Sequence, residues 1–332
     1  MSHLWIIATT AMLSWALTGL ATWYASRAGL LDHPGDRHSH RLPTPRGGGA
    51  GLVLALVLVT TLIAPATAPA FWIFCALPGF VVLAITGWWD DHRSLGVLVR
   101  FLVQLAVTIY LLGCSAIAGW TGNVTAMILA AFFVVWMTNL FNFMDGSNGM
   151  AGLQGVFAGC VLAGLFAFAG DGQSALLGLL LAAACAGFLP WNVGQARVFM
   201  GDVGSLALGF GIAAMLLYGV GSGAFALPVA LLVMLVFLAD ASLTLGARVI
   251  RGERWYNAHR EHAYQRLIAH GWPHGRVAML YQAINIVLVL PGIGVAVRYP
   301  ALAWPVTLSL TGLFWSGWYL LTRNFGEPTQ AE

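Results

Sequence analysis

Long apolar segments recur along the whole chain and constrain its fold more than any other feature. Each is about twenty residues long, the length that a helix needs to cross the hydrocarbon core of a bilayer. Only 8% of the residues are charged, against about 25% in a soluble domain. This excludes a soluble enzyme, a disordered chain and a nucleic-acid-binding protein. The eleven predicted spans cover residues 4–24, 49–65, 70–88, 96–113, 123–142, 150–169, 173–190, 204–220, 224–246, 278–297 and 302–321.

The basic residues are all arginine and lie almost entirely on one side of these spans. Fourteen of the fifteen fall on the same side, and only Arg298 falls on the other. Because basic residues flank spans on the cytoplasmic side, we predict a periplasmic N-terminus and a cytoplasmic C-terminus. The predicted fold is an all-α polytopic membrane protein with one domain over residues 1–332. Its main cytoplasmic loops are expected at about 25–48, 89–95, 143–149, 191–203 and 247–277.

Ten of the twelve acidic residues also fall on the cytoplasmic side. Ionisable groups near a membrane are costly and usually have a functional reason. Of the other two, Asp171 is external. Asp240 lies inside the ninth span, where it either serves a site or pairs with a neighbouring arginine such as Arg248. A transporter would place such groups near the midplane, so the pattern favours an active site at the cytoplasmic face.

Two adjacent carboxylates, Asp90 and Asp91, close the third span in the segment GWWDDHRSLGVLVR. Adjacent carboxylates can face an anionic substrate only if a cation screens them. The pair therefore indicates either a divalent-metal or phosphate-transfer site, or a plain solvated helix end.

Three polar residues, Asn139, Asn142 and Asp145, recur at intervals of three in NLFNFMDGSNGMAG and so form one stripe on a helix. Such a stripe faces a bundle interior or a watery cavity. The glycines that follow, Gly146 and Gly149, favour a turn where the backbone approaches a ligand. Hydrogen bonding between helices is the alternative reason for the two asparagines.

Two further segments place polar groups where predicted helices begin. Asp202 opens the eighth span in FMGDVGSLALGF, where it could cap the helix, bind a metal ion, or do both. Arg46 begins an Arg-Gly-Gly-Gly run just before the second span. Free backbone N–H groups, a helix N-terminus and an arginine make an anion site; a flexible entry turn is the alternative.

The long loop at 247–277 is basic and aromatic. His259, His262 and Arg266 are spaced to share one helical face, and we expect them to bind pyrophosphate. A two-histidine metal site and a basic segment lying on anionic lipid are the alternatives. The four cysteines fall in or at the ends of apolar spans without a C-x-x-C motif. We therefore interpret them as packing residues, and as neither a metal site nor disulfide partners.

Taken in order, these segments resemble the polyprenyl-phosphate N-acetylhexosamine-1-phosphate transferase family. Its members include the phospho-MurNAc-pentapeptide translocase and the GlcNAc-1-phosphate transferases that start O-antigen and teichoic-acid linkage units. The resemblance covers nearly the whole chain and is closest to the branch that initiates O-antigen or surface-polysaccharide chains. The motifs that carry it are DD at 90–91, NxxNxxDG at 139–146, GDVGSLALG at 201–209, and RxHxxxRL with GxxHxxV between Arg260 and Val277.

The resemblance implies an activity, a location and partners. A UDP-N-acetylhexosamine gives its sugar-1-phosphate to undecaprenyl phosphate with release of UMP, in the first step of O-antigen or other lipopolysaccharide synthesis. The reaction requires Mg²⁺, for which Mn²⁺ is a substitute. The enzyme is expected in the bacterial inner membrane, among membrane lipid, as a homodimer. The resemblance does not select the sugar of the donor, and GlcNAc, GalNAc, FucNAc and QuiNAc are the alternatives.

The resemblance also assigns roles to single residues. Asp202 would bind Mg²⁺, and Asp90 and Asp91 would lie beside the lipid phosphate and could join the metal site. The remaining positions are substrate-binding: Arg37, Arg46, Asn139, Asn142, Asp145, Asn148, His259, His262, Arg266 and His274.

Several positions depart from the family pattern. Asn148 stands where the family often has a second aspartate, and Tyr264 and Gln265 stand where many members have histidine. The chain has no lysine, so phosphate-binding lysine roles must pass to arginine or vanish. These departures argue against the peptidoglycan translocase.

The lipid phosphate is already largely a dianion at neutral pH, which favours direct in-line attack, with Asp90 or Asp91 orienting it or accepting a proton. A covalent aspartyl-phosphate step is the alternative mechanism. A flippase for lipid-linked sugars and a non-catalytic membrane scaffold are the alternative functions; a flippase would show internal repeats, and none is evident.

Overall fold

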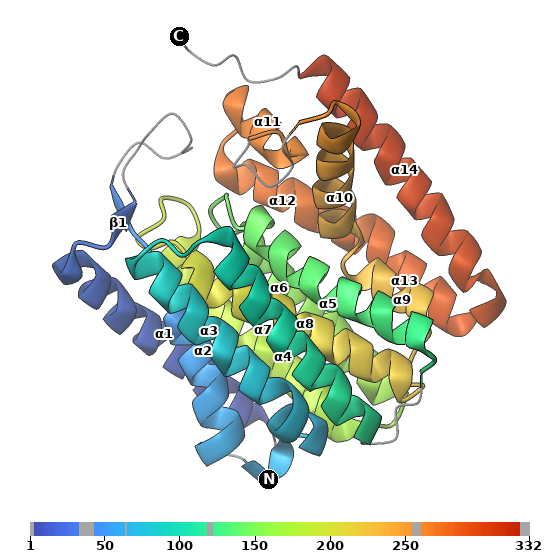
Figure 1. The fold of residues 1–332 in the computed structure, drawn as a ribbon, viewed down its shortest axis with the longest axis horizontal. Helices are drawn as coiled ribbons and strands as arrows, with labels where there is room; N and C mark the ends of the chain where they lie inside the picture. The colour runs from blue at the N-terminus through green and yellow to red at the C-terminus, as the bar shows by residue number, and fades with distance from the viewer. Residues whose placement is uncertain (1–2, 33–42, 64, 118–121, 254–259, 326–332) are drawn as a thin grey trace.

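The structure is a computed structural model that describes residues 3–32, 43–63, 65–117, 122–253 and 260–325. Helices dominate, and Figure 1 shows most of them running side by side, with α1 at one edge and α14 at another. The α-helices are α1 (Leu4–Ala28), α2 (Gly49–Leu58), α3 (Leu77–His92), α4 (Val97–Ile117), α5 (Val124–Met144), α6 (Met150–Phe168), α7 (Gly172–Asn192), α8 (Gly201–Gly221), α9 (Leu227–Val233), α10 (Leu235–Ile250), α11 (Ala263–Ala269), α12 (His274–Ile284), α13 (Leu290–Arg298) and α14 (Ala303–Asn324).

Short elements complete the fold. The segments η1 (Val59–Ile63), η3 (Trp72–Ala76) and η4 (Asn285–Val289) are π-helical turns that continue α2, precede α3 and join α12 to α13. The 3₁₀ turns are η2 (Pro65–Thr67) and η5 (Pro300–Leu302). A two-residue strand β1 (Leu31–Asp32) pairs antiparallel with β2 (Thr44–Pro45).

Eight helical segments of the described chain are long and apolar enough to cross a membrane. The pair α9 and α10 makes a ninth if it is counted as one span, although it is bent by 81°. The predicted second span corresponds to the shorter helix Gly49–Ile63. The predicted eleventh is α14, whose tryptophan and hydroxyl side chains make it less uniformly apolar than the eight. The protein is thus a polytopic helical membrane protein, while the count of eleven and its orientation stay predictions.

The helix α8 lies at the centre of the fold. Of its most apolar eighteen residues, 83% are buried, because small side chains let neighbouring helices approach it closely. A Cβ added at Gly87 of α3 would lie 2.2 Å from the carbonyl oxygen of Asp202, and one added at Gly209 would lie 2.8 Å from that of Met137 in α5. The start of α8 is therefore held at short distance from α3, and its middle is held close to α5.

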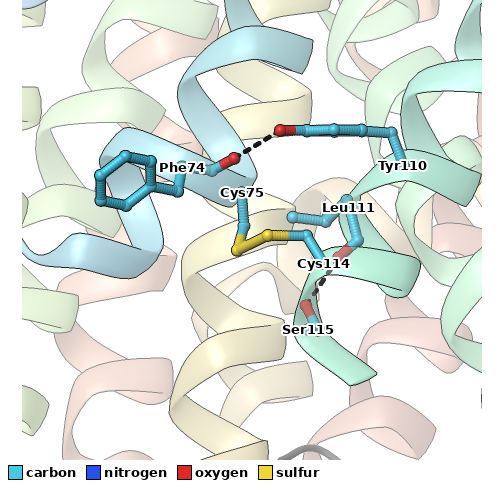
Figure 2. The surroundings of a disulfide bond; sticks show 6 residues. All are labelled: Phe74, Cys75, Tyr110, Leu111, Cys114 and Ser115. Carbon is cyan, nitrogen blue, oxygen red and sulfur yellow. Dashed lines mark hydrogen bonds between the residues drawn. A yellow bond between two sulfur atoms is a disulfide. The ribbon is translucent and has the colours of Figure 1, made fainter. Parts of the chain in front are cut away.

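A disulfide joins Cys75 of η3 to Cys114 of α4 (Figure 2). The prediction that all four cysteines are unpaired packing residues is therefore wrong for these two. The helices α3 and α4 form a hairpin, and the two cysteines lie equally far from its turn, so antiparallel packing brings their Cα atoms to 5.5 Å. Cys160 and Cys185 are free thiols, as expected. The disulfide lies at the end of the hairpin opposite to Asp90 and Asp91.

Candidate active site

A cavity of about 1030 Å³ opens where the ends of α3, α4, α5, α8 and α11 meet. Its lining combines polar and charged side chains with apolar ones. The polar part comprises Asp32, Arg46, Asp91, Arg100, Gln104, Asn139, Asn142, Asp145, Ser147, Asn192, Asp202, Arg260, His262, Tyr264 and Gln265. The apolar part includes Val97, Leu98, Phe101, Phe132, Val135, Trp136, Phe143, Leu245 and Ile268.

Asp91 lies in the last turn of α3 and caps α8. Its two carboxylate oxygens accept hydrogen bonds from the backbone N–H groups of Asp202 and Val203, each at 3.2 Å. These N–H groups belong to the first turn of α8 and have no partner within the helix. A carboxylate there is also favoured by the helix dipole. Gly201 makes the approach possible, since its φ is +74° and a Cβ there would lie 2.6 Å from the Asp91 carboxylate.

Asp202 does not cap its own helix, which corrects one of the two roles that its position suggested. The N-cap position is Met200, and it makes no side-chain cap. The Asp202 carboxylate instead accepts a hydrogen bond at 2.8 Å from Asn142, whose amide also donates to the Ser205 hydroxyl at 2.9 Å. The carboxylate is 25% exposed and lines the cavity. Asn142 thus fixes the direction of a partly accessible carboxylate.

Arg100 of α4 bridges two carboxylates. Its guanidinium lies 2.9 Å from Asp90 Oδ2 and 3.4 Å from Asp202 Oδ2. Asp90 also accepts the backbone N–H of Leu95, just after the turn of the hairpin. Asp90 does not line the cavity, whereas Asp91, Arg100 and Asp202 do. Of the adjacent pair, Asp90 therefore holds Arg100 while Asp91 holds α8.

The predicted stripe on α5 is confirmed, since Asn139, Asn142 and Asp145 all line the cavity. Asn139 and Gln104 of α4 exchange two hydrogen bonds, of 2.7 and 3.2 Å. The two asparagines therefore bond between helices and face a cavity at the same time, so both interpretations of the stripe hold.

Asp145 follows the last residue of α5 and lies near other acids. Burial raises its pKa well above the usual range, and the Asp202 and Asp91 carboxylates raise it further. A hydrogen bond from the backbone of Gly201 partly opposes this increase. The site therefore favours a proton, or another cation, at Asp145.

The Arg46–Gly49 run does not offer a set of free N–H groups, which corrects the predicted backbone anion site. Gly48 and Gly49 donate to the carbonyl oxygens of Phe199 and Met200, at 2.9 Å each. The glycines are needed for this contact, because a Cβ at Gly49 would lie 2.5 Å from the Cα of Gly204. Arg46 itself lines the cavity, and its guanidinium donates to the backbone carbonyl of Asp91.

The helix α11 forms one wall of the cavity. His262 precedes the helix and, with Tyr264 and Gln265, lines the cavity. The Tyr264 hydroxyl donates to the Phe143 carbonyl at 3.0 Å. Burial and the nearby Asp240 raise the Tyr264 pKa well above its usual value, so the phenol keeps the proton that it donates.

Three other predicted residues do not line the cavity. Arg266 does not line the cavity, and its guanidinium donates to the carbonyl oxygens of Glu261 and Thr322 at 3.0 and 3.4 Å. His274 lies 3.1 Å from the hydroxyl of Ser147, which does line the cavity. Asn148 turns away and donates to the Gly194 carbonyl at 2.8 Å. Arg37 and His259 lie outside the described residues.

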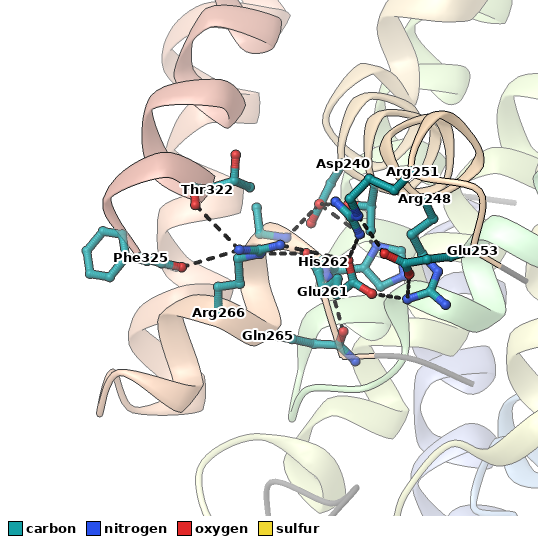
Figure 3. A network of polar contacts seen from close by, with 12 residues as sticks. Asp240, Arg248, Arg251, Glu253, Glu261, His262, Gln265, Arg266, Thr322 and Phe325 are labelled. Atoms are coloured by element: carbon teal, nitrogen blue, oxygen red, sulfur yellow. Dashed lines mark hydrogen bonds and ion pairs between the residues drawn. The ribbon is translucent and has the colours of Figure 1, made fainter. Parts of the chain in front are cut away.

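Asp240 does not pair with Arg248, contrary to the suggested pairing. Arg248 forms an ion pair with Glu253 at 2.9 Å and another with Glu261, which also binds Arg251 (Figure 3). The reason is geometric, since Arg248 lies two helical turns after Asp240 and close to the loop that follows α10. Asp240 bonds instead to the start of α11 and to Tyr281.

Among the carboxylates of the cavity, Asp202 is the one that could hold a magnesium ion. Within the described part of the chain, no group of three or more His, Cys, Asp or Glu side chains is placed to hold a metal. Mg²⁺ does not need such a group, because it is usually held by one or two carboxylates, substrate phosphates and water. Asp202 is accessible and is oriented by Asn142, and its contact with Arg100, at 3.4 Å, is longer than that of Asp90, at 2.9 Å. Asp91 binds the amides of α8.

Several cavity residues were not predicted as site residues. Arg100, Gln104, Asn192 and Arg260 all line the cavity. Arg100 and Gln104 lie one turn apart in an otherwise apolar predicted span, and that spacing was an available signal. Asn192 gave no such signal, because its role depends on the chain folding back: it accepts the Gly149 N–H and donates to the Val198 carbonyl.

The structure is a helical membrane protein with a charged cavity, and comparisons with known proteins place it among membrane sugar-phosphate transferases. The sequence matches the model of glycosyl transferase family 4 over residues 70–220. It is 30% identical to the decaprenyl-phosphate N-acetylglucosaminephosphotransferase of Mycobacterium tuberculosis, over 84% of this chain and 79% of the relative. The chain therefore belongs to glycosyl transferase family 4.

Two other relatives cover a similar part of the chain. The probable undecaprenyl-phosphate N-acetylglucosaminyl 1-phosphate transferase of Bacillus subtilis is 25% identical, over 83% of this chain and 80% of that one. The phospho-N-acetylmuramoyl-pentapeptide-transferase of Moorella thermoacetica is 29% identical, over 77% of this chain and 85% of that one. Two of these relatives are thus polyprenyl-phosphate transferases for N-acetylglucosamine phosphate, and the third is a transferase for phospho-N-acetylmuramoyl-pentapeptide. This chain is similar to all three.

Proposed function

We propose that the protein transfers N-acetylhexosamine-1-phosphate from a UDP-sugar to undecaprenyl phosphate, releasing UMP, and so initiates an O-antigen or another surface polysaccharide. The observation that carries this proposal is the mixed lining of the cavity, which combines charged and apolar side chains. Its charged part, with Arg46, Arg100, Arg260 and Asp202, suits phosphates, and its apolar part suits the first isoprenes of a lipid. A single cavity can thus hold a water-soluble donor against a lipid acceptor.

The proposed reaction exchanges one phosphoanhydride bond for another. An oxygen of the lipid phosphate attacks the phosphorus that carries the sugar, a new P–O bond forms, and the bond to UMP breaks. No proton needs to be removed when the lipid phosphate is a dianion, so the main task is to bring anions together. Mg²⁺ bound at Asp202 would supply positive charge to the donor pyrophosphate.

The chain's own groups would position the reactants. Arg100 lies between Asp90 and Asp202 and presents charge to the cavity. Asp91 uses both carboxylate oxygens on backbone N–H groups, and Asp90 does not line the cavity. Neither carboxylate is therefore well placed as a covalent nucleophile, which supports direct in-line displacement over a phosphoenzyme.

We further propose that the cavity faces the cytoplasm of a bacterial inner membrane. The donor is cytoplasmic, and the positive-inside pattern gives the same orientation. The disulfide lies at the opposite end of the α3–α4 hairpin, which then faces the periplasm, a compartment where disulfides persist. This distribution supports the orientation independently of the arginine pattern.

UMP release from a panel of UDP-N-acetylhexosamines tests the function. The assay uses purified protein in detergent with undecaprenyl phosphate and Mg²⁺, beside EDTA and lipid-free controls and the Asp202→Asn variant. We expect UMP release that requires both lipid and metal and whose rate differs between the donor sugars. In the Asp202→Asn variant, release should be almost lost while the protein stays folded. No release with any donor, from folded protein, would contradict the proposal and favour a flippase. The mass of the protein–detergent complex tests the expected homodimer.

A further inference from the structure

Asp240 is a buried carboxylate of α10 that does not line the cavity. Its side chain is 4% exposed. It accepts hydrogen bonds from the N–H groups of Ala263 at 2.8 Å and Tyr264 at 3.4 Å, and from the hydroxyls of Tyr281 at 2.7 Å and Thr244 at 3.3 Å. A buried charge is costly unless it is so compensated. The contacts show what the charge holds: the first turn of α11 and the side of α12.

The position of Asp240 is fixed from behind. The chain bends by 81° between α9 and α10, which frees backbone groups that a straight helix would pair. Gln154 of α6 donates to the freed carbonyl of Val233 at 3.3 Å, and Asn285 donates to Gln154 at 2.7 Å. Both side chains are fully buried. The start of α10 is thus anchored, so Asp240 has a defined place.

The first turn of α11 is also where this helix meets the cavity. Tyr264 and Gln265 line the cavity, and both lie within two residues of the N–H groups that Asp240 accepts. On the other side, the Tyr264 hydroxyl reaches the Phe143 carbonyl at 3.0 Å. The turn is therefore held at two points, and a small shift at Ala263 would move the wall of the cavity.

We propose that Asp240 is a positioning residue for the nucleotide-sugar donor: through the N–H groups of Ala263 and Tyr264 it holds the first turn of α11 against the cavity. The proposal rests on the proposed function for the identity of the donor. The claim that Asp240 orders α11 does not depend on the proposed function. Asp240 touches no reactant, so it acts on substrate binding and not on bond formation.

The chain supplies a matched control in Asp171. That carboxylate also caps a helix, accepting the Ser174 N–H at 3.0 Å, and also accepts a tyrosine hydroxyl, that of Tyr218 at 3.3 Å. It caps α7 and does not line the cavity. Asp171→Asn therefore repeats the chemical change of Asp240→Asn at a place unconnected with α11.

Two readouts on the purified full-length protein test the proposal. Amide hydrogen exchange reports the order of the 260–269 segment without any substrate, and kinetics with UDP-GlcNAc report donor KM and kcat separately. For Asp240→Asn we expect exchange of the first α11 turn and donor KM each to rise about tenfold, the size of a lost charge-assisted hydrogen bond, with a smaller change in kcat. Asp171→Asn should speed exchange at the start of α7 alone and leave donor KM unchanged.

Tyr281→Phe keeps the test decisive if Asp240→Asn does not fold. It removes one donor to Asp240 and should raise exchange and donor KM in the same direction, by about two- to threefold. Unchanged exchange in α11, or unchanged KM with kcat falling in proportion to the folded fraction, would overturn the proposal. If the wild-type protein does not turn over, the proposed function fails while the exchange measurement still decides whether Asp240 orders α11.

Discussion

The Asp91 carboxylate accepts a hydrogen bond from the backbone N–H of Asp202 at 3.2 Å, so the end of α3 caps the start of α8 where the cavity opens. This relationship separates two acids that the sequence presents alike. Asp91 stabilises the start of α8. Asp202 lies in the first turn of α8 and faces the cavity.

Replacing these two acids should therefore have different effects. Asp91→Ala should lower the unfolding free energy by about 1–2 kcal/mol, as the loss of a helix cap does. It should also raise the Mg²⁺ concentration needed for activity, because Asp202 loses its support. Asp202→Asn should abolish most activity while the melting temperature changes little. Thermal unfolding followed alongside UMP release measures both, and a larger loss of stability in Asp202→Asn would contradict the division of roles.

Arg100 should be coupled to Asp90 in a double-mutant cycle. Arg100→Ala leaves two neighbouring carboxylates without their cation and should reduce turnover at least about tenfold and also lower stability. Adding Asp90→Asn should recover part of the stability, because it removes one of the repelling charges, but not the turnover. Additive losses of stability in the double variant would show that the ion pair is not formed.

The stability of the metal-free protein should depend on pH through Asp145. Its raised pKa means that the folded state holds the proton more tightly than the unfolded state. The resulting stabilisation is present at pH below the usual aspartate value of 3.8 and is lost as pH rises through the raised pKa. In EDTA, Asp145→Asn should therefore melt at a higher temperature than wild type at neutral pH, and the gap should narrow towards pH 4. A difference in melting temperature that widens on acidification would contradict this prediction.

A methyl group at Gly146 should collide with Tyr264. The added Cβ would lie 2.2 Å from the tyrosine hydroxyl oxygen. Overpacking of this kind costs about 1–3 kcal/mol. Because the nearest atom is the hydroxyl, Tyr264→Phe should restore part of the stability lost in Gly146→Ala, although it is itself destabilising through the lost bond to Phe143. Chemical denaturation of the four proteins in the cycle measures this, and no rescue would argue that the contact is absent.

The disulfide should stabilise the fold without supporting the chemistry. Cys114→Ser, or reduction, should lower the unfolding free energy by about 2–4 kcal/mol and leave UMP release by the folded enzyme unchanged, since the bond lies at the far end of the α3–α4 hairpin. A matched Cys185→Ser variant, which alters a buried free thiol, controls for packing. Loss of turnover on mild reduction of folded protein would contradict this separation.

The sequence predicted the membrane class and much of the cavity, because both depend on local patterns. A polar stripe in an apolar helix has only one stable direction, so Asn139, Asn142 and Asp145 could be placed on the cavity wall from their spacing. Their partners could not, since Gln104 reaches Asn139 from α4 and Asp202 reaches Asn142 from α8.

Other features depended on long-range packing and were mispredicted. The amides of Gly48 and Gly49 are bonded to the segment before α8, a contact that no local pattern reveals. The role of Asp240 depended on the bend before α10, which leaves it facing α11 and not Arg248. The Cys75–Cys114 pairing, by contrast, was accessible from the symmetry of two spans about a short turn.

The two sides of the cavity differ in how deeply they are embedded, and this has a consequence for how such a protein can change. The acidic side is built on α8, whose apolar residues are enclosed almost completely by neighbouring helices, so changes of size at those packed residues disturb the whole fold. The opposite side is a helix of seven residues with Gln265 and Ile268 only half buried. Changes at those two positions reshape the cavity at little cost to folding. A lineage could in this way acquire a different donor while its phosphate chemistry stays intact.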